Sequence, residues 1–120
     1  MEVKLAIVGA REFQDYETLK RETDKLIETI GIPTMIVSGG AKGADTLGER
    51  YAKEKGIKML RLLPDWKTHG RAAGLIRNTD IVKECTHVIA FIKGESRGTR
   101  DTIAKATKAG KNVTTIHPSQ

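Results

Sequence analysis

The sequence predicts an α/β fold, namely a single Rossmann-like, doubly wound, mainly parallel five-stranded sheet with helices on both faces. From residue 3 almost to the end, short apolar runs alternate with stretches whose apolar residues recur every three or four positions. No linker or internal repeat interrupts this alternation, so we expect one domain over residues 1–120. Repeated strand–helix–strand units require right-handed crossovers, which produce parallel strands covered on both faces.

The first half of the chain predicts the central strand and two helices. Residues 3–8 (VKLAIV) are almost entirely apolar, which is typical of a strand buried on both faces. A helix over residues 16–30 follows, with Asp15 as its N-cap. A second strand at 35–37 precedes the segment SGGAKGAD, and the next helix continues to about residue 55.

The second half continues the alternation. Pro64 ends the third strand because proline lacks the amide hydrogen that a central ladder needs. The helix after it is expected to bury one apolar face, formed by Ala72, Leu75, Ile76, Thr79 and Val82. The predicted strands are 57–63, 87–92 and 112–116, and the predicted helices are 71–84 and 99–109.

Composition excludes several classes of protein. The 21 Lys and Arg residues exceed the 15 Asp and Glu residues by 6, and 38% of residues are hydrophobic, as in ordinary globular proteins. No apolar run approaches the roughly 20 residues that span a bilayer. The N-terminus also lacks a basic segment and a small-residue cleavage site, so we expect a cytoplasmic protein without membrane contact.

Cysteine and histidine usage argues against a metal centre. Cys85 is the only cysteine, so it cannot form an internal disulfide, and we expect an inert thiol at a helix end. His69, His87 and His117 are far apart and do not have the spacing of metal ligands. We therefore expect no metal and no cofactor.

The candidate ligand site lies where the strands end. In open parallel sheets, ligands bind outside the carboxyl ends of the strands. Four loops at that edge, residues 9–13, 38–45, 69–78 and 93–101, combine glycine with arginine, lysine or hydroxyl groups. The loops at the opposite edge have ordinary turn sequences such as GIPT and AGKN. This asymmetry predicts a ligand site at the carboxyl edge.

Two of these loops predict anion sites at helix N-termini. In SGGAKGAD, glycines permit close backbone approach to a ligand, Lys42 adds a charge, and the next helix offers free amide hydrogens. The loop matches neither GxxxxGK[ST] nor GxGxxG, so it does not predict ATP hydrolysis or NAD redox chemistry. An ordinary strand-to-helix turn is the alternative. The candidate residues are Ser38, Gly39, Gly40, Lys42, Gly43 and Asp45.

The other two groups of candidates lie later in the chain. ESRGTRD repeats the arrangement, with Ser96 or Thr99 as N-cap, and a capped helix with solvated arginines is the alternative. In helix 71–84, a basic face distinct from the apolar one can contact the ligand or simply face solvent. The candidates are Ser96, Arg97, Gly98 and Thr99 in the loop and Arg71, Gly74, Arg77 and Asn78 in the helix.

Taken together, GAREF, SGGAKGAD, LPDWKTHGRAAGLIRN and SRGTRD resemble the SLOG superfamily, most closely its small YspA-like branch of bacterial and phage proteins. The superfamily includes LOG-type phosphoribohydrolases, the DNA-binding protein DprA, and nucleotide-sensing domains of antiphage systems. The resemblance implies a Rossmann-like pocket for a nucleotide or nucleotide derivative, such as an NAD-like, ADP-ribose-like or cyclic nucleotide. Its expected role is sensing or sequestration of that ligand, with phage–bacterium conflict as the setting.

The resemblance also assigns residues to two walls of that pocket. One wall comprises Gly9, Arg11, Gly39, Gly40, Gly43 and Asp45, and the other comprises Arg71, Arg77, Asn78, Ser96, Gly98 and Thr99. LOG hydrolases read PGGxGTxxE, whereas this chain lacks Pro-Gly-Gly and has Thr102 in place of the glutamate. Arg77 can still match the arginine of the hydrolase pair. A LOG-like N-glycosidic hydrolase is therefore an alternative function, with Asp101 or Asp45 as the catalytic carboxylate.

A nucleic-acid partner is less favoured. The chain has only five aromatic residues, and single-strand binding normally uses aromatic stacking platforms. A DprA-like nucleic-acid binder is thus a third reading, after small-molecule binding and hydrolysis. A homo-oligomer is compatible with all three readings.

Overall fold

The computed structural model describes residues 2–118 and contains a fully parallel sheet with the strand order β3-β2-β1-β4-β5. The central strand is β1, as its apolar sequence predicts, and the Rossmann-like α/β fold class is confirmed. The strands are β1 (Lys4–Gly9), β2 (Met35–Ser38), β3 (Met59–Arg61), β4 (His87–Phe91) and β5 (Asn112–Ile116).

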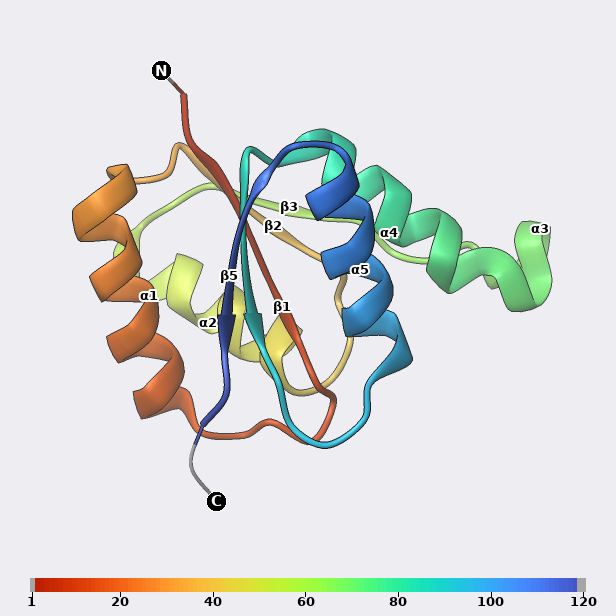
Figure 1. Cartoon of the computed structure of the whole chain (residues 1–120), viewed down its shortest axis with the longest axis horizontal. Coiled ribbons are helices and arrows are strands. Elements are labelled where there is room, and N and C mark those ends of the chain that lie inside the picture. Colours follow the sequence, from red (N-terminus) through yellow and green to blue (C-terminus); the bar gives the residue numbers. More distant parts are fainter. Residues whose placement is uncertain (1, 119–120) are drawn as a thin grey trace.

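Helices cover both faces of the sheet (Figure 1). On one face lie α1 (Tyr16–Ile30) and α2 (Ala44–Lys55), and on the other lie α4 (Ala73–Glu84) and α5 (Arg97–Lys108). The short helix α3 (Trp66–His69) and the 3₁₀ turn η1 (Gly70–Ala72) connect β3 to α4. Within residues 2–118, no helix has the length and apolar character needed to cross a membrane.

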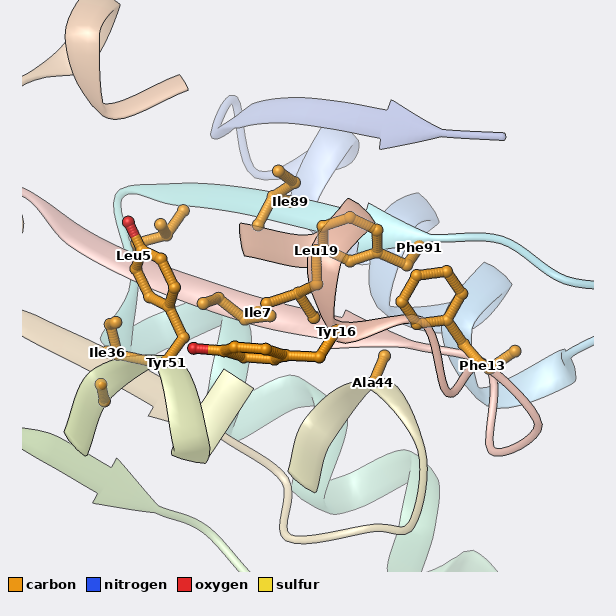
Figure 2. Close-up of a cluster of buried hydrophobic side chains, with 12 residues drawn as sticks. Leu5, Ile7, Phe13, Tyr16, Leu19, Ile36, Ala44, Tyr51, Ile89 and Phe91 are labelled. Atoms are coloured by element: carbon orange, nitrogen blue, oxygen red, sulfur yellow. The ribbon is translucent and has the colours of Figure 1, made fainter. Parts of the chain in front are cut away.

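The layer between the sheet and helices α1 and α2 is the larger part of the core. Figure 2 shows Ile7 and Ile89 of the sheet near Leu19 of α1 and Tyr51 of α2. Phe13, in the loop after β1, stacks on Phe91 with ring centroids 5.1 Å apart. These contacts bury the end of β1 and the end of β4 together, and so fix the edge at which the candidate site lies.

The opposite layer contains Val8, Ile81, Val88 and Ala106, among other apolar residues, together with the cysteine. Cys85 is the C-cap of α4 and is buried, and burial raises the pKa of its thiol to about 11. The expected position at a helix end is confirmed, and the lack of reactivity of the thiol stays a prediction that its burial favours.

The segment between β3 and α4 differs from the sequence prediction. The third strand spans only Met59–Arg61, and the long helix begins at Ala73 rather than at residue 71. Leu75 and Ile76, which we expected to be buried, are 50% and 38% exposed. Ile81, omitted from the predicted face, is 1% exposed.

The physical reason for this error is that apolar side chains do not mark the inward face of α4. Leu75 and Ile76 lie within α4 but are exposed, whereas the inward face of the helix carries a polar residue, Asn78. The pattern assigns Asn78 to a face distinct from the apolar one, and therefore places the buried side incorrectly. The true inward face consists of Ala73, Asn78, Ile81 and Val82.

Candidate ligand-binding site at the carboxyl ends of β1 and β4

A cavity of about 310 Å³ opens at the carboxyl ends of β1 and β4. These neighbouring strands are followed by helices on opposite faces of the sheet, α1 after β1 and α5 after β4, as Figure 1 shows. Such a reversal of strand order leaves a crevice in which open α/β sheets bind ligands. Nine of the predicted site residues line the cavity: Gly9, Arg11, Asp45, Arg77, Asn78, Ser96, Arg97, Gly98 and Thr99.

The N-terminus of α5 forms one wall. Ser96 is the N-cap, and its Oγ accepts a hydrogen bond from the Thr99 amide at 3.3 Å, which decides between the two caps that the sequence allowed. Gly98 gives the wall an open surface, because a Cβ built on it would meet nothing within 4 Å. Lys93 and Arg97 line the cavity at this end, together with the acidic Glu95. The wall therefore offers a positive helix end together with two cations.

The N-terminus of α2 is arranged differently. A Cβ on Gly43 would lie 2.3 Å from Ala10 O, and the Ala44 amide donates to this same carbonyl at 3.2 Å. Gly43 has φ +79°, a conformation that glycine adopts without strain. The glycine thus packs α2 against the loop after β1, and this helix start points toward protein backbone. Of the residues predicted around it, Ser38, Gly39, Gly40, Lys42 and Gly43 do not line the cavity.

Asp45 is the residue through which α2 contributes to the cavity wall. It is 5% exposed, and its Oδ2 accepts a long hydrogen bond from the Ala41 amide at 3.4 Å. Burial raises the pKa of Asp45 to about 6, although the Ala41 amide and the charge of Arg77 favour the ionised form. A carboxylate with so little hydrogen bonding from protein retains acceptor capacity for a ligand.

Arg77 and Asn78 tie the walls of the cavity together. Arg77 donates from Nη1 to Gly39 O at 2.5 Å and from Nε to Asn78 Oδ1 at 3.0 Å. Asn78 in turn donates from Nδ2 to Gly98 O at 3.2 Å. This chain of contacts links the loop after β2, helix α4 and the start of α5. Desolvation lowers the pKa of Arg77, but the guanidinium remains charged at any physiological pH.

Asp101, the other predicted carboxylate, lies outside the cavity lining. Its Oδ2 accepts hydrogen bonds from Asn78 Nδ2 at 3.1 Å and forms an ion pair with Lys105 Nζ at 2.8 Å. The cavity-facing side chain on this turn of α5 is instead Thr102, whose hydroxyl donates to Gly98 O at 3.1 Å. Asp101 therefore positions Asn78 between the two helices.

Three further predicted residues lie outside the cavity lining, in other parts of the structure. Ser38 donates to Glu49 Oε2 at 2.7 Å and accepts from the Gly40 amide at 3.0 Å. Arg71 belongs to the turn η1 rather than to α4, and it does not line the cavity. Gly74 is also outside the lining, and a Cβ on it would contact the Trp66 ring at 3.7 Å.

The cavity includes residues that were not singled out from the sequence. Glu12, Lys93 and Glu95 lie within loops that the sequence marked, but charged residues in glycine-containing loops carry no signal of their own. Thr102 follows the candidates Gly98 and Thr99 at helical spacing, which is a signal that the sequence does contain. Within residues 2–118, no group of three His, Cys, Asp or Glu side chains is arranged to hold a metal ion.

Comparison with known proteins identifies the family. Residues 3–69 match the YAcAr family model, described as the YspA, cpYpsA-related SLOG family. Gene 61 protein of Mycobacterium phage D29 is 33% identical over 113 residues, a match that covers 89% of this chain and 90% of the phage protein. The chain belongs to the YspA-related SLOG family. The resemblance drawn from the sequence motifs is thus confirmed.

Two solved structures of DNA processing protein A share the fold of this chain. DNA processing protein A from Streptococcus pneumoniae superposes with a TM-score of 0.75 at 24% identity over 98% of this chain. The Helicobacter pylori protein, whose structure is described by its single-stranded DNA binding mode, has a TM-score of 0.73 at 20% identity. This SLOG chain spans 51% and 66% of those two chains. At these identities the likeness establishes the shared fold.

Proposed function

We propose that the protein binds a nucleotide or nucleotide derivative in the cavity at the carboxyl ends of β1 and β4, with a phosphate group at the N-terminus of α5, as a sensor or sequestering protein. The observation that carries the proposal is the convergence of a capped helix start with Lys93 and Arg97 on a cavity at the topological switch point. Aligned peptide dipoles place about half a positive charge at such a helix end. The two side chains add full charges to it.

The cavity also suits the rest of a nucleotide. Its volume of about 310 Å³ is at the lower end of the range for small-molecule sites, roughly 300 to 1,000 Å³, which favours a mononucleotide-sized moiety. Its lining combines cations with carboxylates and hydroxyls, so phosphate, sugar and base can each find complementary groups. Membership in the SLOG family supports the same ligand class.

Isothermal titration calorimetry tests the proposal with matched ligands and matched variants. Nucleoside 5′-monophosphates, ADP-ribose, NAD and cyclic nucleotides are compared with the corresponding nucleosides, which lack phosphate. Arg97→Ala is expected to lower the affinity for phosphate-containing ligands by about tenfold, the scale of one lost charge-assisted hydrogen bond. Arg100→Ala is the control, because Arg100 lies on the same helix outside the cavity lining. Equal affinity for nucleosides and nucleotides would contradict the proposal.

Single-stranded DNA is a second candidate ligand. The SLOG fold is shared with DprA, and the Helicobacter pylori structure is described by that activity. A net charge of +6 also favours attraction to a polyanion. Binding of an oligothymidylate is therefore measured over a range of salt concentrations. Tight binding with a steep salt dependence, together with no affinity for mononucleotides, would favour the DprA-like function over the small-molecule function.

Hydrolysis of a bound nucleotide is a further candidate, and Asp45 is the residue that favours it. A buried carboxylate in the cavity with a raised pKa can act as a general acid or base. Asp101 is held by Asn78 and Lys105 instead. Release of free base or ribose phosphate from a nucleotide over hours, abolished by Asp45→Asn, would establish this activity. Tight binding without release would exclude it.

A further inference from the structure

Asp45 and Arg77 lie on either side of Gly39 at the cavity wall. A Cβ built on Gly39 would be 2.7 Å from Asp45 Oδ2 and 2.8 Å from Arg77 Nη1. Glycine at this position therefore allows a carboxylate from α2 and a guanidinium from α4 to approach the same point of the wall. Both residues line the cavity.

Each of the two groups retains unused hydrogen-bonding capacity. Within residues 2–118, the backbone amides of Ala41, at 3.4 Å from Oδ2, and of Gly39 interact with the Asp45 carboxylate, whereas a carboxylate can accept about four hydrogen bonds. Within the same range, Arg77 uses Nε and Nη1 on Asn78, Gly39 and Leu62, and Nη2 makes no hydrogen bond. A buried charged group with free positions in a cavity is suited to a polar ligand group, because leaving it unpaired is unfavourable.

The charges at this point favour an uncharged ligand group. The negative charge of Asp45 repels a phosphate, and it offsets the positive charge of Arg77 beside it. What the pair offers is an acceptor next to a donor. A vicinal diol matches this arrangement, since each hydroxyl both donates and accepts a hydrogen bond.

The position of Asp45 and Arg77 relative to α5 favours contact with the ribose of a nucleotide rather than with its base. Arg77 bonds Asn78, and Asn78 bonds Gly98 O at the start of α5, so the pair lies two contacts from the proposed phosphate site. In a 5′-nucleotide, the sugar is the group joined directly to the phosphate. A group this close to the phosphate site is therefore expected to meet the sugar.

We infer that Asp45 and Arg77 together recognise the 2′ and 3′ hydroxyls of a 5′-phosphorylated ribonucleotide, so that the site selects ribonucleotides against 2′-deoxyribonucleotides. This inference rests on the function proposed above. Asp45 accepts from the 2′ hydroxyl, and Arg77 Nη2 donates to the 3′ hydroxyl. Arg97 and the start of α5 hold the phosphate and are indifferent to the sugar.

Calorimetry with each of the four ribonucleoside 5′-monophosphates and its 2′-deoxy counterpart tests the inference. In the wild-type protein, the best-binding ribonucleotide is expected to have at least about tenfold higher affinity than its deoxy form, on the scale of a hydrogen bond to a charged group. Asp45→Ala is expected to bring this ratio close to one. Asp80→Asn is the control, because Asp80 is an exposed carboxylate of α4 outside the cavity lining, and this variant is expected to leave the ratio unchanged.

The outcomes are distinguishable. Equal affinities for ribo and deoxy forms in the wild type, or a ratio that survives Asp45→Ala, overturn the inference while leaving phosphate binding intact. Arg97→Ala is expected to weaken both forms by the same factor. Melting curves establish that each variant is folded, and Asp45→Leu, which also lacks a hydrogen-bond acceptor, repeats the measurement should the alanine variant not fold. Absence of binding by every nucleotide overturns the proposed function and this inference together.

Discussion

Ser96 and Thr99 are joined by two hydrogen bonds at the start of α5, from the Thr99 amide to Ser96 Oγ at 3.3 Å and between the two hydroxyls at 2.7 Å. This cap orients the first turn of α5 toward the cavity at the ends of β1 and β4. The corresponding start of α2 has Gly43 as its N-cap, with no side-chain hydrogen bond. The two helix starts that look alike in sequence therefore differ in structure, and the anion site that we propose uses only the start of α5.

The burial of Asp45 predicts how stability changes with pH. Its pKa in the folded protein is about 6, above the ordinary value of 3.8, so the folded state binds the proton more tightly than the unfolded state. The stabilising contribution is complete below about pH 4 and is lost as the pH rises through 6. Asp45→Asn removes the ionisation, and we expect this variant to be more stable than wild type at pH 7.5 by on the order of 2 kcal/mol.

Urea unfolding of both proteins between pH 4.5 and 7.5 measures this effect. The difference between Asp45→Asn and wild type is expected to grow with pH across that range. The exposed Asp80 provides a control, because Asp80→Asn is expected to change stability by less than about 0.5 kcal/mol at either pH. A constant difference between Asp45→Asn and wild type would show that Asp45 does not titrate in this window.

The packing of Gly43 against the loop after β1 predicts an unequal cost of two glycine substitutions. Gly43 and Gly56 both have positive φ, at +79° and +67°. A Cβ on Gly43 meets Ala10 O at 2.3 Å, whereas one on Gly56 meets nothing within 4 Å. We expect Gly56→Ala to destabilise by about 1 kcal/mol through backbone strain alone, and Gly43→Ala by at least about 3 kcal/mol. Equal losses in thermal unfolding would contradict the packing role.

Asn78 is expected to be important for stability as well as for the site. Its side chain bonds Arg77, Gly98 and Asp101 in a buried position. Asn78→Ala leaves the Arg77 Nε without a partner and removes one hydrogen bond each from Gly98 O and Asp101, so we expect a loss of about 2 kcal/mol. Thr79→Ala, on the neighbouring and more exposed position of α4, is the control and is expected to lose less than about 1 kcal/mol. Chemical denaturation that gives the two variants the same stability would exclude a joining role for Asn78.

The register of α4 can be checked by truncation of its apolar residues. Leu75→Ala and Ile76→Ala are each expected to cost less than about 1 kcal/mol, because both side chains are substantially exposed. Ile81→Ala removes a fully buried side chain, and we expect a loss of about 2 to 5 kcal/mol. Larger losses of stability at Leu75 and Ile76 than at Ile81 would support the buried face that the sequence alone predicts.

Some features of the fold could be predicted from the sequence because they are local, whereas others depend on contacts between distant segments. Strand positions and the Rossmann-like topology were predictable, because the apolar run of β1 and the caps at Asp15 and Ser96 are local features. The outcome around Gly43 was not predictable, because glycine in a loop is equally compatible with ligand approach and with packing against another backbone. Only the position of the Ala10 carbonyl decides between them.

The candidate site, like the fold, could be predicted from the sequence only in part. Arg77 and Asn78 were chosen as members of a polar helix face, and both do line the cavity, whereas Arg71 does not. The difference arises from the 3₁₀ turn η1, which no periodicity in the sequence marks. Asp101 and Asp45 were equivalent in sequence, since both were expected in first helical turns. In the structure, α5 begins at Arg97, Asp101 pairs with Lys105 one turn later, and of the two aspartates only Asp45 lines the cavity.

Titration of the ¹⁵N-labelled protein with a nucleoside 5′-monophosphate, followed by amide NMR spectra, tests the central claim most directly. Phosphate bound at the start of α5 is expected to shift the amide signals of Arg97, Gly98 and Thr99 most strongly and to leave those of Gly43 and Ala44 nearly unchanged. The same titration with the nucleoside is expected to leave the α5 signals in place. Shifts concentrated at Gly43 and Ala44, with none at the start of α5, would contradict the account.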